Sequence, residues 1–172
     1  MDITAEIRGL KELQRKTDQM VTDLHGTPML NGMRDSTLIV VRYARQNSPV
    51  DTGKLKASIL PEIRTMGETV QGVVGSNLQY AAAVEFGSRP HWPPVMALAG
   101  WVHRKGLAGK FSGRSAAGER SITELYIAQM IVLKIAAKGT KAQPYLQPAF
   151  DKARPAIVRR IGEVVSEIVE KH

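Results

Sequence analysis

The chain has 172 residues, 43% of them hydrophobic and 5% aromatic, contains no cysteine and carries a formal net charge of +8. This length and apolar fraction suit one core of ordinary size, built from aliphatic side chains between helices, so we expect a single domain over residues 1–172. The absence of cysteine excludes disulfides and thiolate metal sites.

The positive charge is concentrated in the second half of the sequence. Residues 1–47 hold seven basic and six acidic side chains, whereas residues 89–120 hold six basic and one acidic, and residues 134–160 hold seven basic and one acidic. Such a basic surface suits a polyanion or an acidic protein, and charge alone does not separate these partners.

The sequence gives no sign of export or of a membrane partner. Residues 1–4 begin with an acidic side chain, whereas a secretory signal begins with basic residues and an apolar stretch. The most apolar run, residues 126–137, contains Gln129 and Lys134 and is too short to span a bilayer. We therefore expect a soluble protein.

Two helices are predicted at the start of the chain. Apolar residues recur at steps of three and four between Ile3 and Leu24, with charged residues between them, which predicts an amphipathic helix. His25-Gly26 is a plausible end, and Thr27-Pro28 suits the start of a second helix that runs to about Gln46. Asn31-Gly32 leaves a later start open.

A rigid turn follows the second helix. Pro49 cannot continue a helix, and Gly53 allows the backbone to turn. The side chain of Asp51 or Thr52 can accept hydrogen bonds from nearby amides, as in an Asx turn or at the N-cap of a short helix. That helix would carry Leu55 and Ser58.

A β-hairpin is predicted next. Residues 59–66 and 69–76 have the composition of strands and flank a short Gly-containing turn. Pro61 belongs at a strand start or an edge, because it has no amide to donate. Gly72 and Gly75 indicate a bulge or the close approach of another backbone.

Short helices and a Gly-rich segment are predicted after the hairpin. Residues 80–86 suit two helical turns ended by Gly87, and residues 89–94 are extended because they contain three prolines. Residues 95–104 predict a further helix with Gly106 at its C-terminal cap. Residues 106–118 contain four glycines and few apolar side chains, so we expect a mobile loop.

The remaining elements are helical. Ser121 and Glu124 have the spacing of a capping box at the start of a helix that ends at Gly139. Residues 143–148 predict an extended crossing, with pairing to the hairpin as one option. A final helix is expected from Ala149 onward, with Pro155 as a kink or a second start.

No motif for catalysis or cofactor binding is present in the sequence. The four histidines share no metal-ligand spacing, Gly106–Lys110 lacks the spacing of a phosphate loop, and no Gly-x-Ser-x-Gly sequence occurs. We therefore predict no catalytic, metal or cofactor site, and no enzyme.

Glu85 and the two tryptophans each allow a functional and a structural interpretation. Glu85 lies among apolar residues and needs a cationic or amide partner if it is buried, so we favour an ion pair or cap over a catalytic role. Trp92 and Trp101 lie near basic residues and can stack on nucleic acid bases. An aromatic anchor in a protein interface or core is the favoured alternative.

Three blocks of sequence, taken together, resemble one family. These blocks are Pro49–Ile59, Tyr80-Ala81 with Val84–Pro90, and Lys141–Phe150. They are similar in order and spacing to the small neck or tail-completion proteins of long-tailed bacteriophages, also described as minor tail components or head-tail joining proteins. In the third block the family usually has Phe where this chain has Tyr145.

The resemblance implies an α+β fold, with a small antiparallel sheet packed against long N- and C-terminal amphipathic helices. An extra helical and Gly-rich insertion would occupy about residues 91–139. The resemblance implies no enzyme activity and no cofactor. The residues that it makes fold-defining are Pro49, Asp51, Thr52, Gly53, Leu55, Ser58, Tyr80, Glu85, Phe86, Gly87, Pro144, Leu146 and Pro148.

The resemblance also implies a structural role in the virion neck, after assembly in the host cytoplasm. The chain would form a homo-oligomeric ring, with six copies expected, at the head-proximal end of the tail. Its partners would be the tail terminator or tail tube and the head connector or stopper. A tail-terminator ring, a head-closure ring and a basic DNA-binding protein are the alternatives. Contacts with DNA in the lumen, or with an acidic neighbour, are expected from Arg89, Arg104, Lys105, Lys110 and Arg114.

Overall fold

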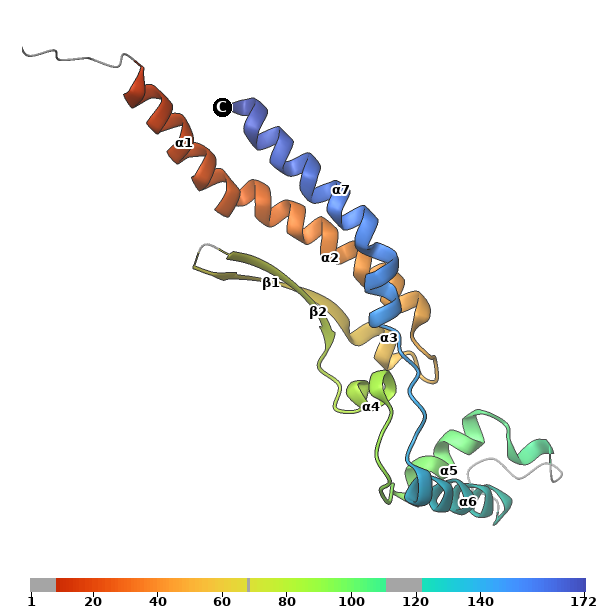
Figure 1. Ribbon diagram of the computed structural model, residues 1–172. Helices are drawn as coiled ribbons and strands as arrows, with labels where there is room; N and C mark the ends of the chain where they lie inside the picture. Colours follow the sequence, from red (N-terminus) through yellow and green to blue (C-terminus); the bar gives the residue numbers. More distant parts are fainter. Residues whose placement is uncertain (1–8, 68, 111–121) are drawn as a thin grey trace, which may run out of the picture. The chain divides into compact units, whose positions relative to one another are not determined.

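The computed structural model of the protein describes residues 9–67, 69–110 and 122–172 (Figure 1). It combines helices with a two-stranded antiparallel sheet, which confirms the predicted α+β class. None of the described helices is long and apolar enough to cross a membrane. The elements are α1 (Leu10–His25), α2 (Thr27–Asn47), α3 (Lys54–Ser58), β1 (Ile59–Met66), β2 (Thr69–Ser76), α4 (Ala81–Phe86), α5 (Val95–Arg104), the 3₁₀ turn η1 (Ala108–Lys110), α6 (Ile122–Lys138) and α7 (Gln147–Lys171).

The chain divides into two compact units. The first unit contains α1, α2, the hairpin and α7, within Met1–Asn47, Ile59–Ser76 and Leu146–His172. The second unit contains α3, α4, α5, η1 and α6, within Ser48–Ser58 and Asn77–Tyr145. The single domain over residues 1–172 stays a prediction.

The core of the first unit lies between α2 and α7. These helices run side by side (Figure 1). The buried apolar side chains of the two helices are mostly small or β-branched: Val40, Val41 and Ala44 of α2, and Ala149, Ala153, Val164 and Ile168 of α7. A Cβ added to Gly32 would lie 2.7 Å from Cγ2 of Val164, so glycine permits the close contact. Helix α2 begins at Thr27 and continues through Asn31-Gly32, so the later start that these residues left open is not observed.

The hairpin has the predicted strands, packed against α2. Its register runs without interruption from Ile59 opposite Ser76 to Met66 opposite Thr69, so Gly72 and Gly75 form no bulge. A Cβ on Gly72 would lie 2.5 Å from the Thr37 methyl group of α2, whereas Gly75 faces open space. The prediction of a bulge or a backbone approach was wrong, because helix side chains fill the space above Gly72.

Helix α1 begins at Leu10, and the predicted start near Ile3 lies outside the described residues. The Asp23 carboxylate near its end accepts hydrogen bonds from Lys171 Nζ at 2.9 Å and from His172 Nε2 at 3.1 Å. These hydrogen bonds lower the pKa of Asp23. No residue of α1 is buried.

Helices α5 and α6 form the core of the second unit. Ala99 and Val102 of α5 pack with Ala128 of α6, and larger apolar side chains surround them. The bounds of α5 are the predicted ones. Glu124 of α6 is buried, and one of its carboxylate oxygens lies 2.7 Å from His103 Nδ1. Ser121, the other half of the predicted capping box, lies outside the described residues.

The first residues of the segment predicted as a loop after α5 form a defined structure. Gly106 has φ +63, as expected for a residue that ends a helix, and the 3₁₀ turn η1 buries Ala108. The rest of the predicted loop, residues 111–118, lies outside the described residues.

The crossing before α7 differs from the prediction at both ends. The hairpin has two strands only, and the described crossing forms its hydrogen bonds elsewhere: Gln143 N–H donates to Val84 O at 2.8 Å. Gln147 and Pro148 belong to α7, because proline is well suited to the first turn of a helix. Helix α7 then continues through Pro155, so the alternative that a second helix starts at Pro155 was wrong.

Candidate functional site

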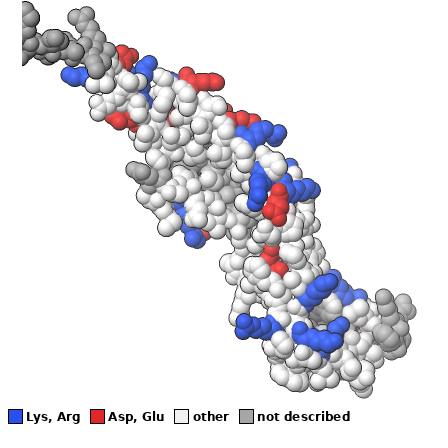
Figure 2. Space-filling model, viewed as in Figure 1, with Lys and Arg blue, Asp and Glu red and all other residues white. Residues whose placement is uncertain are grey.

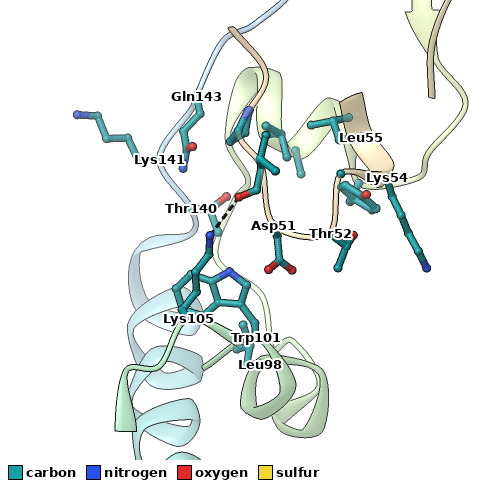
Figure 3. Close-up of a pocket in the computed structure, with 16 residues that line it drawn as sticks. Asp51, Thr52, Lys54, Leu55, Leu98, Trp101, Lys105, Thr140, Lys141 and Gln143 are labelled. Carbon is teal, nitrogen blue, oxygen red and sulfur yellow. Dashed lines mark hydrogen bonds between the residues drawn. The ribbon is translucent and has the colours of Figure 1, made fainter. Parts of the chain in front are cut away.

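The three sequence blocks meet around one pocket of the second unit (Figure 3), with a volume of ≈ 570 Å³. The Pro49–Leu55 turn forms one wall and α4 another. Leu98 and Trp101 of α5, with Lys105 directly after it, form a third wall, and Thr140, Lys141 and Gln143 complete the pocket. Segments far apart in sequence therefore build a single site.

The turn at the pocket is shaped by glycine and closed by α3. Gly53 has φ +79, a conformation that glycine adopts without steric cost, and its carbonyl oxygen accepts a hydrogen bond from Ala57 N–H at 3.0 Å. Leu55 is buried, and Ser58 Oγ donates to Leu55 O at 2.8 Å. Thr52 lines the pocket.

Two basic residues at the end of α5 hold this turn. Arg104 Nη2 lies 2.6 Å from Asp51 Oδ2, and Arg104 Nε lies 3.2 Å from both carboxylate oxygens. Lys105 Nζ donates to the Val50 carbonyl oxygen at 3.1 Å, the bond dashed in Figure 3. The hydrogen bonds from Arg104 lower the pKa of Asp51, and the pKa of Arg104 is raised in return.

Glu85 of α4 binds the backbone of the crossing. Its Oε2 accepts a hydrogen bond from Tyr145 N–H at 2.7 Å, and only 5% of Glu85 and 1% of Tyr145 are exposed. Burial raises the pKa of the Tyr145 hydroxyl, and the nearby charge of Glu85 raises it further. Glu85 therefore has the amide partner that a buried carboxylate requires.

Two glycines allow the chain after α4 and the chain after α6 to touch. Ser88 and Thr140 form an antiparallel bridge, with N–H···O distances of 3.1 and 3.2 Å. A Cβ on Gly87 would lie 2.6 Å from Thr140 O, and a Cβ on Gly139 would collide with Ser88 O. Both glycines also have positive φ, so no other residue fits here without strain.

The pocket is lined by apolar and basic side chains. Leu55, Val84, Leu98 and Trp101 supply the apolar surface, and Lys54, Lys105 and Lys141 supply the charge. Asp51 is the only carboxylate in the lining, and Arg104 pairs with it. The described residues hold no cluster of His, Asp or Glu that fits a metal ion. The arrangement suits binding through shape and charge.

The structure places the other predicted residues in several positions. Tyr80 lines the pocket, whereas Phe86 is 80% exposed and Trp92 is 70% exposed. Arg89 and Pro144 are exposed, Leu146 is half-buried and Pro148 lies in α7. The Lys110 side chain and Arg114 lie outside the described residues.

Eight lining residues were not among the predicted site residues: Val50, Lys54, Ala83, Val84, Leu98, Thr140, Lys141 and Gln143. Lys54 and Lys141 stand inside the first and third blocks, so the order of the blocks was the available signal. No signal in the sequence assigned Leu98 or Thr140 to the pocket.

Most of the net charge belongs to the second unit. Its ranges hold 11 basic and four acidic residues, a difference of +7, which leaves +1 for the first unit. Three of the four acids have partners: Asp51 contacts Arg104, Glu85 contacts Tyr145 and Glu124 contacts His103. Figure 2 shows basic side chains over α5 and α6 on the face in view.

Comparison with known proteins bears on the part of the chain that precedes α5. Residues 8–87 match the model of the HK97-gp10-like family, which is described as "Bacteriophage HK97-gp10, putative tail-component". This part of the chain is similar to that family. The match confirms the predicted resemblance, and the matched family is described as a bacteriophage tail component. No curated protein and no solved structure matches the chain.

The HK97-gp10-like match covers the first block and most of the second. It includes the elements from α1 to α4 and stops before α5. The third block and the expected insertion at 91–139 therefore lie beyond the matched region. The family description names a tail component and no enzymatic activity.

Proposed function

We propose that the protein is a structural component of the phage neck. Copies of the chain form a ring at the head-proximal end of the tail, where the ring completes the tail and helps to join it to the head. The family match over residues 8–87 carries this proposal. The convergence of the three neck-type blocks on one pocket supports it.

The chemistry of the pocket favours assembly over catalysis. Its apolar lining suits an apolar side chain of another protein, and its lysines suit a carboxylate beside that side chain. The tail terminator or tail tube and the head connector or stopper are the partners proposed for these contacts. No step of the proposed function requires a cofactor.

Immunoelectron microscopy of purified particles tests the neck position. A gold-labelled antibody against this chain should mark the head-tail junction, and particles from a deletion of the gene should show separate heads and tails without label. Label along the tail or at its distal tip would contradict the neck position. Complete particles without label would overturn the virion role.

Contact with DNA in the lumen of the ring is a second proposal, and the charge of +7 on the second unit favours it. Retention on DNA should fall steeply as salt rises, since phosphate contacts release counterions. Reversing the charges of Lys134 and Lys138 should weaken retention, whereas reversing Lys11 and Lys16 of the first unit should not. Sequence-selective binding at moderate salt would favour a free DNA-binding protein instead.

A further inference from the structure

Helix α1 has an apolar face that the described chain covers only in part, since Met20 and Leu24 are half-buried and the other apolar residues are exposed. It separates apolar and polar side chains more sharply than α2, α5, α6 or α7, yet it has no buried residue. Leu10 is 55% exposed, Leu13 63% and Val21 47%. An amphipathic helix normally buries its apolar face, so this face is suited to a partner.

Helix α6 has a second uncovered apolar face. Its 17 residues include three charged ones, Glu124, Lys134 and Lys138, and the helix is therefore apolar almost all round. Ala128 and Val132 lie on the buried side. On the opposite side an exposed stripe, hereafter the α6 stripe, recurs at steps of four, four and three: Ile122, Tyr126, Met130 and Leu133.

The two faces match in length. At 1.5 Å per residue, the α6 stripe is about 17 Å long and the apolar face of α1 from Leu10 to Leu24 about 21 Å long. Helix surfaces of this kind pack by fitting the ridges of one helix into the grooves of the other. Packing one on the other would therefore cover both.

Charge disfavours one way in which two copies can meet. Contact between two α6 stripes would bring two units of +7 together and place Lys134 and Lys138 of both copies at the seam, which is unfavourable. Helix α1 holds three basic and three acidic residues and is neutral, and it belongs to a unit of +1. The α6 stripe therefore tolerates α1 of another copy better than a second α6.

We propose that the apolar face of α1 in one copy packs on the α6 stripe of the next copy. Each copy then has one donor face, the apolar face of α1, and one acceptor face, the α6 stripe. The contact is therefore head-to-tail and repeats around a closed ring. This inference rests on the proposed function, because the neck ring supplies the closed arrangement.

Engineered cysteines test the contact cleanly, since the natural chain has none. Thr17 lies midway along the apolar face of α1, and Tyr126 lies near the middle of the α6 stripe, so the direction of the helices does not matter. Thr17→Cys and Tyr126→Cys are made in separate, differently tagged proteins, which are mixed and treated with a short bis-maleimide. We expect the mixed dimer to exceed either self-dimer about tenfold, the ratio that 1.4 kcal/mol of preference gives.

Arg15→Cys is the matched control, because it is exposed on the opposite side of the same helix. It should cross-link poorly to Tyr126→Cys. Equal yields from Thr17→Cys and Arg15→Cys, a predominant Tyr126→Cys self-dimer, or no mixed dimer up to the solubility limit would each overturn the contact.

A complementation experiment gives an independent readout. Leu13→Asp removes the donor face and Met130→Asp removes the acceptor face, and both residues are exposed, so each variant should fold and remain monomeric. Mixed in equal amounts they retain one intact contact and should form dimers that grow no further, as measured by sedimentation. A mixture that stays monomeric, or single variants that assemble like the natural chain, would contradict the inference.

The failure of this inference is distinguishable from failure of the proposed function. Antibody label at the head-tail junction without a mixed dimer would leave the neck role standing and remove the α1–α6 contact. A mixed dimer together with particles that carry no label would do the reverse.

Discussion

The two units of the chain are held together by different kinds of contact. In the first unit α2 and α7 meet through side chains, and Gly32 faces a methyl group of Val164. In the second unit the backbones after α4 and α6 touch directly, so Gly87 and Gly139 meet carbonyl oxygens. A side chain can be trimmed or can move, whereas a backbone carbonyl in a bridge cannot.

The units also differ in charge. The first unit balances its acids and bases, whereas the second unit carries +7 and uses its described acids for internal contacts. The first unit is therefore the better scaffold and the second unit the better contact surface for anionic partners. Both tryptophans, Trp92 and Trp101, lie in the second unit, so their fluorescence reports its unfolding separately.

The largest effect is expected from Gly139→Ala. The substitution should destabilise the second unit by about 3 kcal/mol or more, since the left-handed backbone costs about 1–2 kcal/mol and the collision with Ser88 O adds to it. The tryptophan transition on thermal unfolding measures the loss. Gly106→Ala, at φ +63 with no atom within 4 Å, and Gly53→Ala, at φ +79 with none, should show the backbone cost alone. Equal losses at all three glycines would refute the close approach.

Glu85→Ala should have the next largest effect. The variant leaves the Tyr145 amide buried without its acceptor, which costs about 2–3 kcal/mol, whereas Glu85→Gln keeps an acceptor oxygen and should cost about 1 kcal/mol. Chemical denaturation followed by tryptophan fluorescence separates the two. If both variants lost the same amount, the hydrogen bond to Tyr145 would not be the stabilising feature.

A double-mutant cycle at Gly32 and Val164 tests the contrasting behaviour of the first unit. Gly32→Ala should cost about 1–2 kcal/mol, because the clash with Val164 outweighs the gain in helix propensity. Val164→Ala removes the clashing methyl groups, so the double variant should be about 1 kcal/mol more stable than the sum of the single changes. Far-UV circular dichroism measures the loss, because this unit contains the three longest helices apart from α6, and the tryptophan signal of the second unit is the reference. Strict additivity would show that the two residues do not meet.

The smallest effect is expected from Asp51→Asn, and it concerns pH. The hydrogen bond from Arg104 lowers the pKa of Asp51, so its contribution to stability is complete above the unfolded value of 3.8 and is lost as the pH falls through the lower folded value. Two other carboxyl groups with lowered pKa, Asp23 and Glu62, lie in the first unit. The tryptophan transition of the Asn variant should therefore lose less stability between pH 5 and pH 2 than that of the natural chain, and identical slopes would count against the pairing.

Local signals predicted several elements to the residue. The strands at 59–66 and 69–76 and the helix at 95–104 have the predicted bounds, because glycine and proline punctuate these segments. The end of α6 at Gly139 was predicted for the same reason. Pro148 was misassigned, because the same residue suits both an extended segment and the first turn of a helix.

The site itself depended on contacts that sequence spacing does not contain. Arg104 and Asp51 are 53 residues apart, and Tyr145 and Glu85 are 60 apart. The sequence predicted that Glu85 needs a partner, but only the fold supplied the Tyr145 amide. The reason for Gly72 was likewise hidden, because the methyl group that it accommodates belongs to α2.

By itself, the sequence determined the fold class, the order of the elements and the resemblance to phage tail proteins, since these follow from local periodicity, turn residues and motif order. Only the tertiary structure decided that the three blocks share one pocket and that the acids of the second unit are used internally. It also decided that α1 and α6 each keep an apolar face uncovered. The physical reason is that periodicity shows which face of a helix is apolar, whereas burial depends on what packs against that face.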